Sequence, residues 1–249
     1  MPMAALRVWS VAIDRFDVAM ASHTLSPEER ERADRFRHDG AQRDFIVMRH
    51  VLRRFLADLS GKALGDIEIL LSGYGKPWVE NGPYFSLSHS GDRGLVALSW
   101  DGPIGVDIEI PDRLTWADDP IALARTAFHP AEVNWLASVP APSRRAAFFA
   151  IWCRREALLK AAGVGIAVDP GCLQTDLNQS AGRPVSFSPP IVRSDGEWRR
   201  YAAAGAQVPP GKPGWWVRNL DIDGTPAALA GAGNLGADIE ISVKHVGLH

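Results

Sequence analysis

Two acidic residues close together, Asp107 and Glu109, are the first candidates for chemistry in this chain of 249 residues. They lie in the segment Gly105–Ile110, in which apolar and acidic residues alternate. On a β-strand this spacing places both carboxylates on one face, about 7 Å apart at a rise of roughly 3.3 Å per residue. Such a pair can share a divalent cation, for example Mg²⁺ with water and substrate phosphate oxygens. The alternative is an ordinary half-exposed strand with a solvated acidic edge.

A second pattern lies in the segment Trp152–Lys160, which predicts a helix. Glu156 and Lys160 are four residues apart and therefore share one helix face, with Arg155 next to it. The alternative is a surface ion pair worth a few tenths of a kcal/mol. The surrounding helix is rich in Phe, Trp, Ile and Leu. Charged residues in such an apolar helix are more easily explained by a function than by chance.

A third pattern is the segment Phe85–Ser90, in which alternating strand residues end in a Ser-His-Ser tip before a glycine. A serine next to His89 invites comparison with hydrolases, but there is no G-x-S-x-G turn, and adjacent strand residues point to opposite faces. Two hydroxyls beside a histidine suit phosphate binding at least as well. Upstream, the turn Gly75-Lys76-Pro77 presents one lysine and is a weak signal by itself.

The elements that must position these residues follow the order helices, then strands, twice over. Ser26-Pro27 with Glu29 is a capping box that begins a helix to about Arg37. The helices expected from apolar periodicity are 41–59, 119–128, 130–137 and 143–162, and the strands are 67–71, 84–88, 94–100, 104–110, 184–188, 198–202, 215–220 and 227–230. This order predicts an α+β fold rather than an alternating parallel sheet.

Composition excludes several classes of protein. With 46% hydrophobic residues the chain can bury a sizeable core, and 27 basic against 29 acidic residues give none of the basic excess of a general nucleic-acid binder. Two cysteines do not make a disulfide framework or a four-ligand zinc site. Since the start is unlike a signal peptide and no apolar run approaches the roughly 20 residues that span a bilayer, we expect a cytoplasmic protein without membrane contact.

Taken together and in order, four segments resemble the Sfp-type 4′-phosphopantetheinyl transferase family. They are GKP at 75–77, FSLSHS at 85–90, GVDIE at 105–109 and WCRREALLKAAG at 152–163, within a match from about Ser26 to Val168. The resemblance implies transfer of phosphopantetheine from coenzyme A to a serine of an acyl, aryl or peptidyl carrier protein, with release of adenosine 3′,5′-bisphosphate. Family members of this type often serve polyketide or nonribosomal peptide synthases.

The resemblance also implies an architecture. Family members of this length are pseudo-dimers of two similar α+β halves with the active site in the cleft between them. For this chain we expect an N-terminal half over residues 1–103, a C-terminal half with the metal-site motifs over 104–230, and a weakly patterned tail over 231–249. One chain would then form the whole site as a monomer.

Site residues are carried over position by position. Asp107, Glu109 and Glu156 resemble the family's magnesium ligands, with Mn²⁺ as a possible substitute for Mg²⁺. Glu156 or Glu109 is the candidate base for the carrier serine, and the choice between them stays open. Lys160 resembles the lysine that meets phosphate oxygens and can protonate the departing group.

Further positions resemble contacts to coenzyme A, the co-substrate. In chain order they are Arg32, Arg43, Lys76, Pro77, Ser88, His89, Arg155 and Lys160, with Arg32 and Arg43 expected near the ribose 3′-phosphate. Two positions depart from the family pattern. Arg155 stands where lysine is usual, and Glu29 occupies a common lysine position in the basic N-terminal stretch.

Two other functions fit part of the pattern. A metal-dependent nuclease can also use a strand with Asp-x-Glu and a helix with Glu and Lys, although the net charge of −2 counts against it. A non-catalytic coenzyme A or carrier-protein binding module is the other alternative. The presence of all three acidic positions together with Lys160 favours the enzyme.

Overall fold

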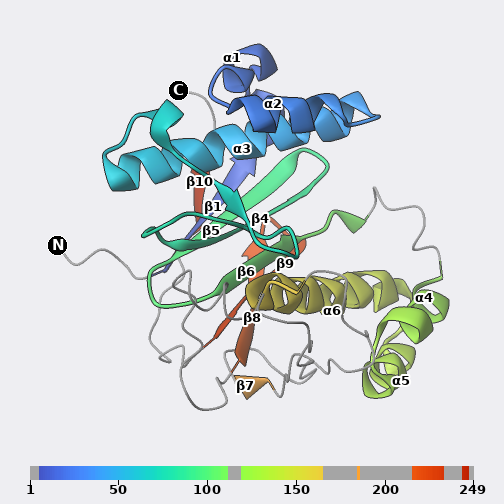
Figure 1. Ribbon diagram of the computed structural model, residues 1–249. Coiled ribbons are helices and arrows are strands. Elements are labelled where there is room, and N and C mark those ends of the chain that lie inside the picture. The colour runs from blue at the N-terminus through green and yellow to red at the C-terminus, as the bar shows by residue number, and fades with distance from the viewer. Residues whose placement is uncertain (1–5, 112–118, 165–183, 186–214, 233–242, 247–249) are drawn as a thin grey trace.

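The computed structural model describes residues 6–111, 119–164, 184–185, 215–232 and 243–246 (Figure 1). Within them, a group of helices and the strands of a mainly antiparallel sheet follow each other twice along the chain after the first strand, which confirms the predicted α+β class. The helices are α1 (Val18–Ser22), α2 (Pro27–Asp34), α3 (Asp39–Ser60), α4 (Pro120–Ala127), α5 (Pro130–Ser138) and α6 (Ala141–Ala162). None of these helices is long and apolar enough to cross a membrane.

The first half of the chain builds a sheet covered by α3. Its strands are β1 (Leu6–Ala12), β4 (Tyr84–Ser90) and β5 (Arg93–Ser99), joined by β10 (Val243–Val246) in the order β10-β1-β5-β4. β5 pairs antiparallel with both β1 and β4, whereas β10 is parallel to β1. A small ribbon of β2 (Leu70–Leu71) and β3 (Pro77–Trp78) leads from α3 toward β4.

The second half builds another sheet, covered by α6. Its strands are β6 (Ile104–Ile108), β7 (Pro184–Val185), β8 (Trp215–Ile222) and β9 (Thr225–Ala232), in the order β6-β9-β8-β7. All described pairings in this sheet are antiparallel. β6 carries Asp107 and ends at Ile108, so the strand expected over 104–110 is shorter than predicted and Glu109 directly follows it. β6 is an edge strand of the second sheet, just as β4 is an edge strand of the first.

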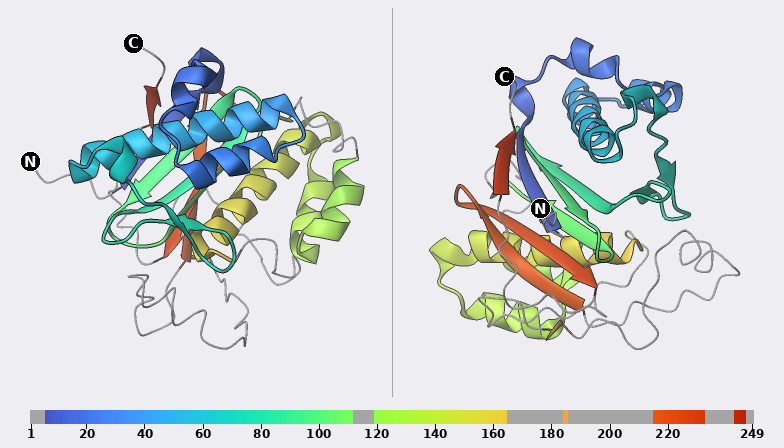
Figure 2. Two further views of the ribbon diagram at one scale, coloured as in Figure 1. Left: turned by 45° about the horizontal axis from the view of Figure 1, so that its top comes forward. Right: turned by 90° about the vertical axis from the view of Figure 1, so that its left-hand side faces the viewer.

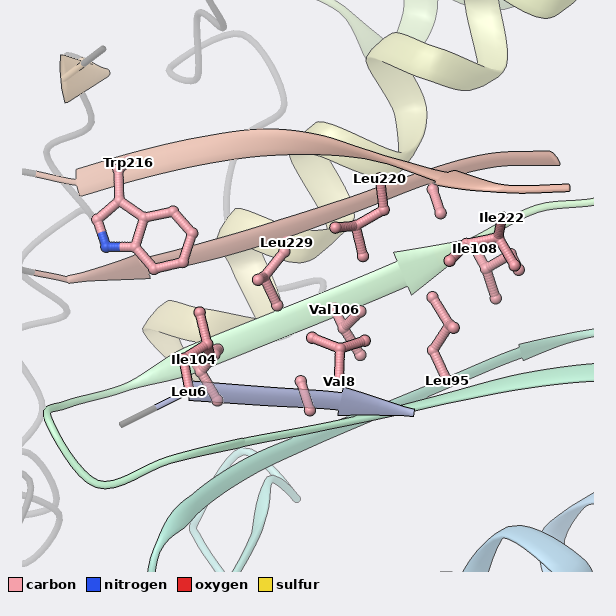
Figure 3. Packing of buried hydrophobic residues seen from close by; sticks show 12 residues of the cluster. Leu6, Val8, Leu95, Ile104, Val106, Ile108, Trp216, Leu220, Ile222 and Leu229 are labelled. Atoms are coloured by element: carbon pink, nitrogen blue, oxygen red, sulfur yellow. The ribbon is translucent and has the colours of Figure 1, made fainter. Parts of the chain in front are cut away.

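The two sheets pack face to face, with α3 outside one and α6 outside the other (Figure 2). The layer between the sheets is apolar: Val8 and Leu95 come from the first sheet, and Val106, Trp216 and Leu229 come from the second (Figure 3). Alternate residues of β6 point the other way, toward α6. Val106 is thus in the core between the sheets, whereas Asp107 lies on the side of the helix that carries Glu156.

Local sequence explains where the main helices begin and end. Ser26 Oγ accepts from the Glu29 backbone N–H, and the Glu29 side chain accepts from the Ser26 backbone N–H, so α2 begins with the predicted capping box. α3 and α6 each end at a glycine in the left-handed conformation, Gly61 and Gly163, with φ of 69° and 71°. These stops place Lys160 in the last turn of α6.

Gly105 permits the closest contact in the second half. A Cβ atom at this position would lie 1.9 Å from the Ala157 carbonyl oxygen and 2.4 Å from the Ala161 backbone nitrogen. Both are backbone atoms, which cannot rotate away as a side chain could. α6 therefore lies directly on β6 only because residue 105 has no side chain.

Several expectations from the sequence need correction or completion. β1 and α1 were not predicted, and the strand expected over 67–71 is reduced to Leu70–Leu71 after a 3₁₀ turn at Leu64–Asp66. Part of the expected tail, Val243–Val246, forms strand β10, because the exposed edge of β1 offers backbone groups with which it can pair. The strand expected at 198–202 lies outside the described residues. The division of the chain into two halves that meet at 103/104, with a tail from 231, stays a proposal, and so does the pseudo-dimer. The first sheet also contains β10, a strand from the end of the chain.

Gly105→Ala is expected to lower the free energy of unfolding by about 3 kcal/mol, the upper end for overpacking. The added methyl group must push α6 away from β6, because it meets backbone atoms. Urea unfolding followed by tryptophan fluorescence measures the change. Gly40→Ala in α3 is the matched control, since a Cβ there meets nothing within 4 Å. Equal stability of the two variants would contradict the importance of this contact.

Candidate functional site

Asp107 is the most buried of the predicted acidic residues, with 3% of its surface exposed. Its Oδ1 accepts two hydrogen bonds, from Ser88 Oγ at 2.8 Å and from Lys160 Nζ at 2.6 Å. Its Oδ2 is also buried but has no hydrogen-bond partner among the described residues. A buried carboxylate oxygen without a donor is costly, so this atom indicates a place where a positively charged ligand would be favourable.

Glu109 and Glu156 belong to the same electrostatic group. Burial raises the pKa of Glu109 to about 7, the charge of Asp107 adds to this rise, and a hydrogen bond from Ser90 Oγ at 3.0 Å opposes it. Burial also raises the pKa of Glu156, again with a contribution from Asp107. Because the charge of Asp107 contributes to both shifts, the segment 107–109 and helix α6 bring these carboxylates close to one another.

The three carboxylates have the oxygen chemistry that a hard cation prefers, but their side chains do not surround a common point. Among the described residues, no group of three or more His, Cys, Asp or Glu side chains is arranged so that it could hold a metal ion. Nevertheless, the partnerless Oδ2 of Asp107 and the mutual repulsion with Glu109 and Glu156 are properties that a divalent cation would relieve. The oxygen-only donor set is typical of Mg²⁺ or Mn²⁺.

A cleft of about 220 Å³ lies next to Lys160 and is lined from both halves. Tyr74, Pro77 and Phe85 contribute from the first half, and Leu159 and Gly163 from the end of α6. The walls are thus mainly apolar and aromatic, and Lys76 and Lys160 are the charged residues among those that line them. Such a cleft can hold a flat apolar group while a charged part of the same ligand reaches Lys160.

Lys76 joins the two halves beneath this cleft. Its Nζ donates to the carbonyl oxygens of Ile104 at 3.1 Å and Ala161 at 3.2 Å, and also to that of Lys160. Two of these carbonyls belong to the last turn of α6, where a cation is favoured by the helix dipole. Burial lowers the pKa of Lys76 to about 7, while three carbonyl acceptors favour the ammonium form with its three donors.

Comparison with known proteins shows the family to which the chain belongs. Residues 103–205 match the family model described as the 4′-phosphopantetheinyl transferase superfamily. The 4′-phosphopantetheinyl transferase HetI of Nostoc sp. is 33% identical over 65% of this chain and 70% of its own length. The chain belongs to the 4′-phosphopantetheinyl transferase superfamily. The resemblance found in the four sequence motifs is thereby confirmed.

Two further transferases support the assignment to this class of enzyme. The 4′-phosphopantetheinyl transferase gsp of Aneurinibacillus migulanus is 29% identical, over 68% of this chain and 68% of its own length. The transferase Sfp of Bacillus subtilis is 28% identical over 68% of this chain and 76% of its own length. The matches thus span about two thirds to three quarters of these relatives.

Arg155 of this phosphopantetheinyl transferase lies in the core. Its Nη1 donates to Glu132 Oε2 at 2.7 Å, and its guanidinium lies over the Phe128 ring at 5.3 Å. The two partners belong to α5 and to the end of α4, so Arg155 connects three helices. The proposed contact between Arg155 and coenzyme A is therefore not favoured by this placement.

Ser88 and His89 point in opposite directions from β4, as strand geometry requires. The Ser88 hydroxyl is buried and already bonded to Asp107 and Lys160, so its predicted contact with coenzyme A is not favoured either. His89 lies on the exposed side of the strand. Among the described residues its ring makes no hydrogen bond to the three carboxylates, and its contact with a phosphate stays a proposal.

The basic residues near the N-terminus are held by neighbours of their own. Arg43 pairs with Asp44 at 3.3 Å, and Arg32 lies over the Phe45 ring at 5.3 Å. Glu29, which replaces a common lysine, receives Arg53 at 2.6 Å and Arg49 at 3.4 Å. The Glu29 carboxylate thus joins α2 to α3. Glu29 and Arg32 both line a cavity of about 480 Å³. Contact of Arg32 and Arg43 with a 3′-phosphate stays a proposal.

Two features of the site were missed by the sequence analysis. Ser90 holds Glu109, and the strict alternation of serines at 86, 88 and 90 could have indicated that one face of β4 is polar. The three carbonyl partners of Lys76 had no signal in the sequence, because two of them are more than 80 residues away along the chain.

Lys76→Met is expected to lower the free energy of unfolding by about 1–3 kcal/mol, since carbonyl oxygens at the end of α6 lose a charged donor. Differential scanning calorimetry at pH 6.5 measures the change in Tm. Lys62→Met, at an exposed position just after α3, is the control and is expected to have no such effect. A Tm for Lys76→Met equal to that of the control would remove Lys76 from its connecting role.

Glu109→Gln is expected to stabilise the metal-free protein at pH 8 but not at pH 4. A carboxyl whose pKa rises from 4.5 to about 7 on folding binds a proton more tightly in the native state, so its contribution to stability falls as the pH rises through this range. Glutamine has no charge to bury and escapes this loss. Urea unfolding in EDTA across the range measures the difference, and a difference that does not change with pH would contradict the assigned pKa.

Proposed function

We propose that this protein transfers the 4′-phosphopantetheine group from coenzyme A to a serine of a carrier protein, with Mg²⁺ as its metal ion. The observation that carries this proposal is the meeting of Asp107, Glu109 and Glu156 with Lys160 beside a cleft lined by both halves. The named functions of the transferases HetI and Sfp support the same reaction class.

The reaction is a phosphoryl-type transfer whose atoms balance simply. The carrier serine oxygen forms a bond to the phosphorus that bears pantetheine, and the bond from this phosphorus to the bridging oxygen breaks. The leaving group, adenosine 3′,5′-bisphosphate, keeps the bridging oxygen. The serine proton must go to a base, and negative charge on the departing phosphate must be stabilised.

Two carboxylates are suited to accept the serine proton. Burial raises the pKa of Glu109 to about 7, so this carboxylate can take a proton near neutral pH and release it again. Burial also raises the pKa of Glu156, which makes it a better proton acceptor than an exposed glutamate. Asp107 is engaged by two donors on one oxygen and is the better candidate for holding the cation. The choice between Glu109 and Glu156 as the base stays open.

Lys160 is suited to the other end of the reacting bond. It is held by Asp107 and Ser88 at its ammonium group, but it also lines the cleft and keeps 31% of its side chain exposed. An ammonium at this place can donate to phosphate oxygens and to the leaving group. A Mg²⁺ ion held by Asp107, Glu109 and Glu156 would add neutralisation of the diphosphate charge.

The cleft supplies a place for the nucleotide part of coenzyme A. Its walls of Tyr74, Pro77, Phe85 and Leu159 fit a flat base, and Lys160 marks the direction of the phosphates. Because both walls come from one chain, a monomer is sufficient for this site. A second molecule, the carrier protein, then needs only to bring its serine to the open side.

Asp107→Asn is expected to reduce carrier modification by about 100-fold or more, because loss of a ligand charge removes several kcal/mol of transition-state stabilisation. Mass spectrometry of an acyl or peptidyl carrier protein incubated with coenzyme A measures the reaction, with wild type in EDTA and after re-addition of Mg²⁺ or Mn²⁺ as matched conditions. Asp58→Asn, on the solvent side of α3, is the control.

The same samples test the alternatives. Full modification in EDTA, or wild-type rates for Asp107→Asn, would contradict a metal-assisted transferase. Bound coenzyme A without any mass shift on the carrier would favour a binding module. Cleavage of plasmid DNA with Mg²⁺ in place of carrier modification would favour a nuclease.

A further inference from the structure

Three serines form a seam between the two sheets. β4 and β6 are edge strands of different sheets, and the hydroxyls of Ser86, Ser88 and Ser90 on β4 accept from backbone N–H groups of β6 and of the residues that follow it. The accepting bonds come from Val106 at 3.0 Å, Ile108 at 3.4 Å and Ile110 at 3.0 Å. The serine side chains on every second residue of β4 thus accept hydrogen bonds from N–H groups that would normally bond to the backbone of a neighbouring strand.

Two of the three serines also hold a carboxylate. Each serine lies opposite the residue 19 positions later: Ser88 donates to Asp107 at 2.8 Å, and Ser90 donates to Glu109 at 3.0 Å. The corresponding position for Ser86 is Gly105, which has no side chain. The same seam bond is therefore made three times, but only two of the three serines reach an acid.

Ser88 has no hydrogen-bonding capacity left for a ligand. A serine hydroxyl offers one donor and two acceptor positions. Ser88 donates to Asp107 and accepts from the Ile108 N–H and from Lys160 Nζ at 2.9 Å. The hydroxyl consequently fixes one oxygen of Asp107, and the other oxygen, Oδ2, is buried and has no hydrogen-bond partner in the part of the chain that the structure describes.

We propose that Ser88 and Ser90 are positioning residues for metal binding, each holding from the first half a carboxylate that the second half supplies. This inference rests on the proposed function, which assigns a metal to Asp107 and Glu109. It makes the geometry of the metal ligands depend on how the two halves sit against each other. Neighbouring groups that orient ligands in this way commonly change metal affinity by about 10–100-fold when removed.

The test compares Ser88→Ala and Ser90→Ala with Ser86→Ala as the matched control. All three variants lose one seam bond, and Ser88→Ala and Ser90→Ala also lose their bond to a carboxylate. Urea unfolding checks that each variant is folded under the conditions of the binding measurement. Binding of Mn²⁺ to the whole protein, measured by electron paramagnetic resonance of free Mn²⁺, is expected to weaken about 10-fold or more for Ser88→Ala and Ser90→Ala. It should stay within about twofold of wild type for Ser86→Ala, whose serine has no acid opposite.

The outcomes separate this inference from the proposed function. Equal Mn²⁺ affinity in wild type, Ser88→Ala and Ser90→Ala would overturn the positioning role, even if wild type modifies a carrier protein. A loss of affinity in Ser86→Ala as large as in the other two would also overturn it, because the effect would then come from the seam alone. If wild type fails to modify carriers but the two variants bind Mn²⁺ weakly, the positioning role stands and the proposed function fails. Should Ser88→Ala not fold, Ser90→Ala carries the same comparison.

Discussion

The direct packing of α6 on β6 is the contact on which the site depends. It exists because Gly105 leaves room for the Ala157 carbonyl, and it brings one turn with Glu156 and the next with Lys160 over the strand that carries Asp107. A helix held a side chain further away would leave Lys160 unable to bond Asp107 at 2.6 Å. The glycine of the GVDIE motif therefore has a packing role, whereas its acids have a chemical one.

The first half contributes fewer charged groups to the site than the second half does, but several of its side chains hold the site residues of the second half in position. The serines of β4 hold β6 and two of its carboxylates, and Lys76 bonds the start of β6 and the end of α6. These contacts join segments 19 to 85 residues apart. These polar contacts thus join the two halves at the place where the reaction is proposed. The apolar layer between the sheets holds the halves together but does not by itself fix the positions of these polar groups.

Local signals in the sequence predicted local structure well. The capping box at Ser26 and the glycine stops at Gly61 and Gly163 all follow from residues within or next to one element. What depends on distant partners was not predictable in the same way. The sequence predicted that Arg155 is available to contact coenzyme A. Its partner Glu132, however, lies 23 residues earlier on another helix. Similarly, β10 could not be predicted from a weak pattern, because the strand forms on the edge of β1 from the opposite end of the chain.

The electrostatics of the site argue that its acids are present for binding rather than for folding. When ionised, Asp107, Glu109 and Glu156 together with Lys160 carry three negative charges and one positive charge in a largely buried place. Folding alone would be better served by neutral residues there, since burial raises the pKa of two of these acids and Asp107 Oδ2 has no donor among the described residues. Protonation relieves the repulsion at low pH, whereas at neutral pH a bound cation would relieve it. The metal ion of the proposed reaction would bring this positive charge, and it would also offset the negative charge of a diphosphate.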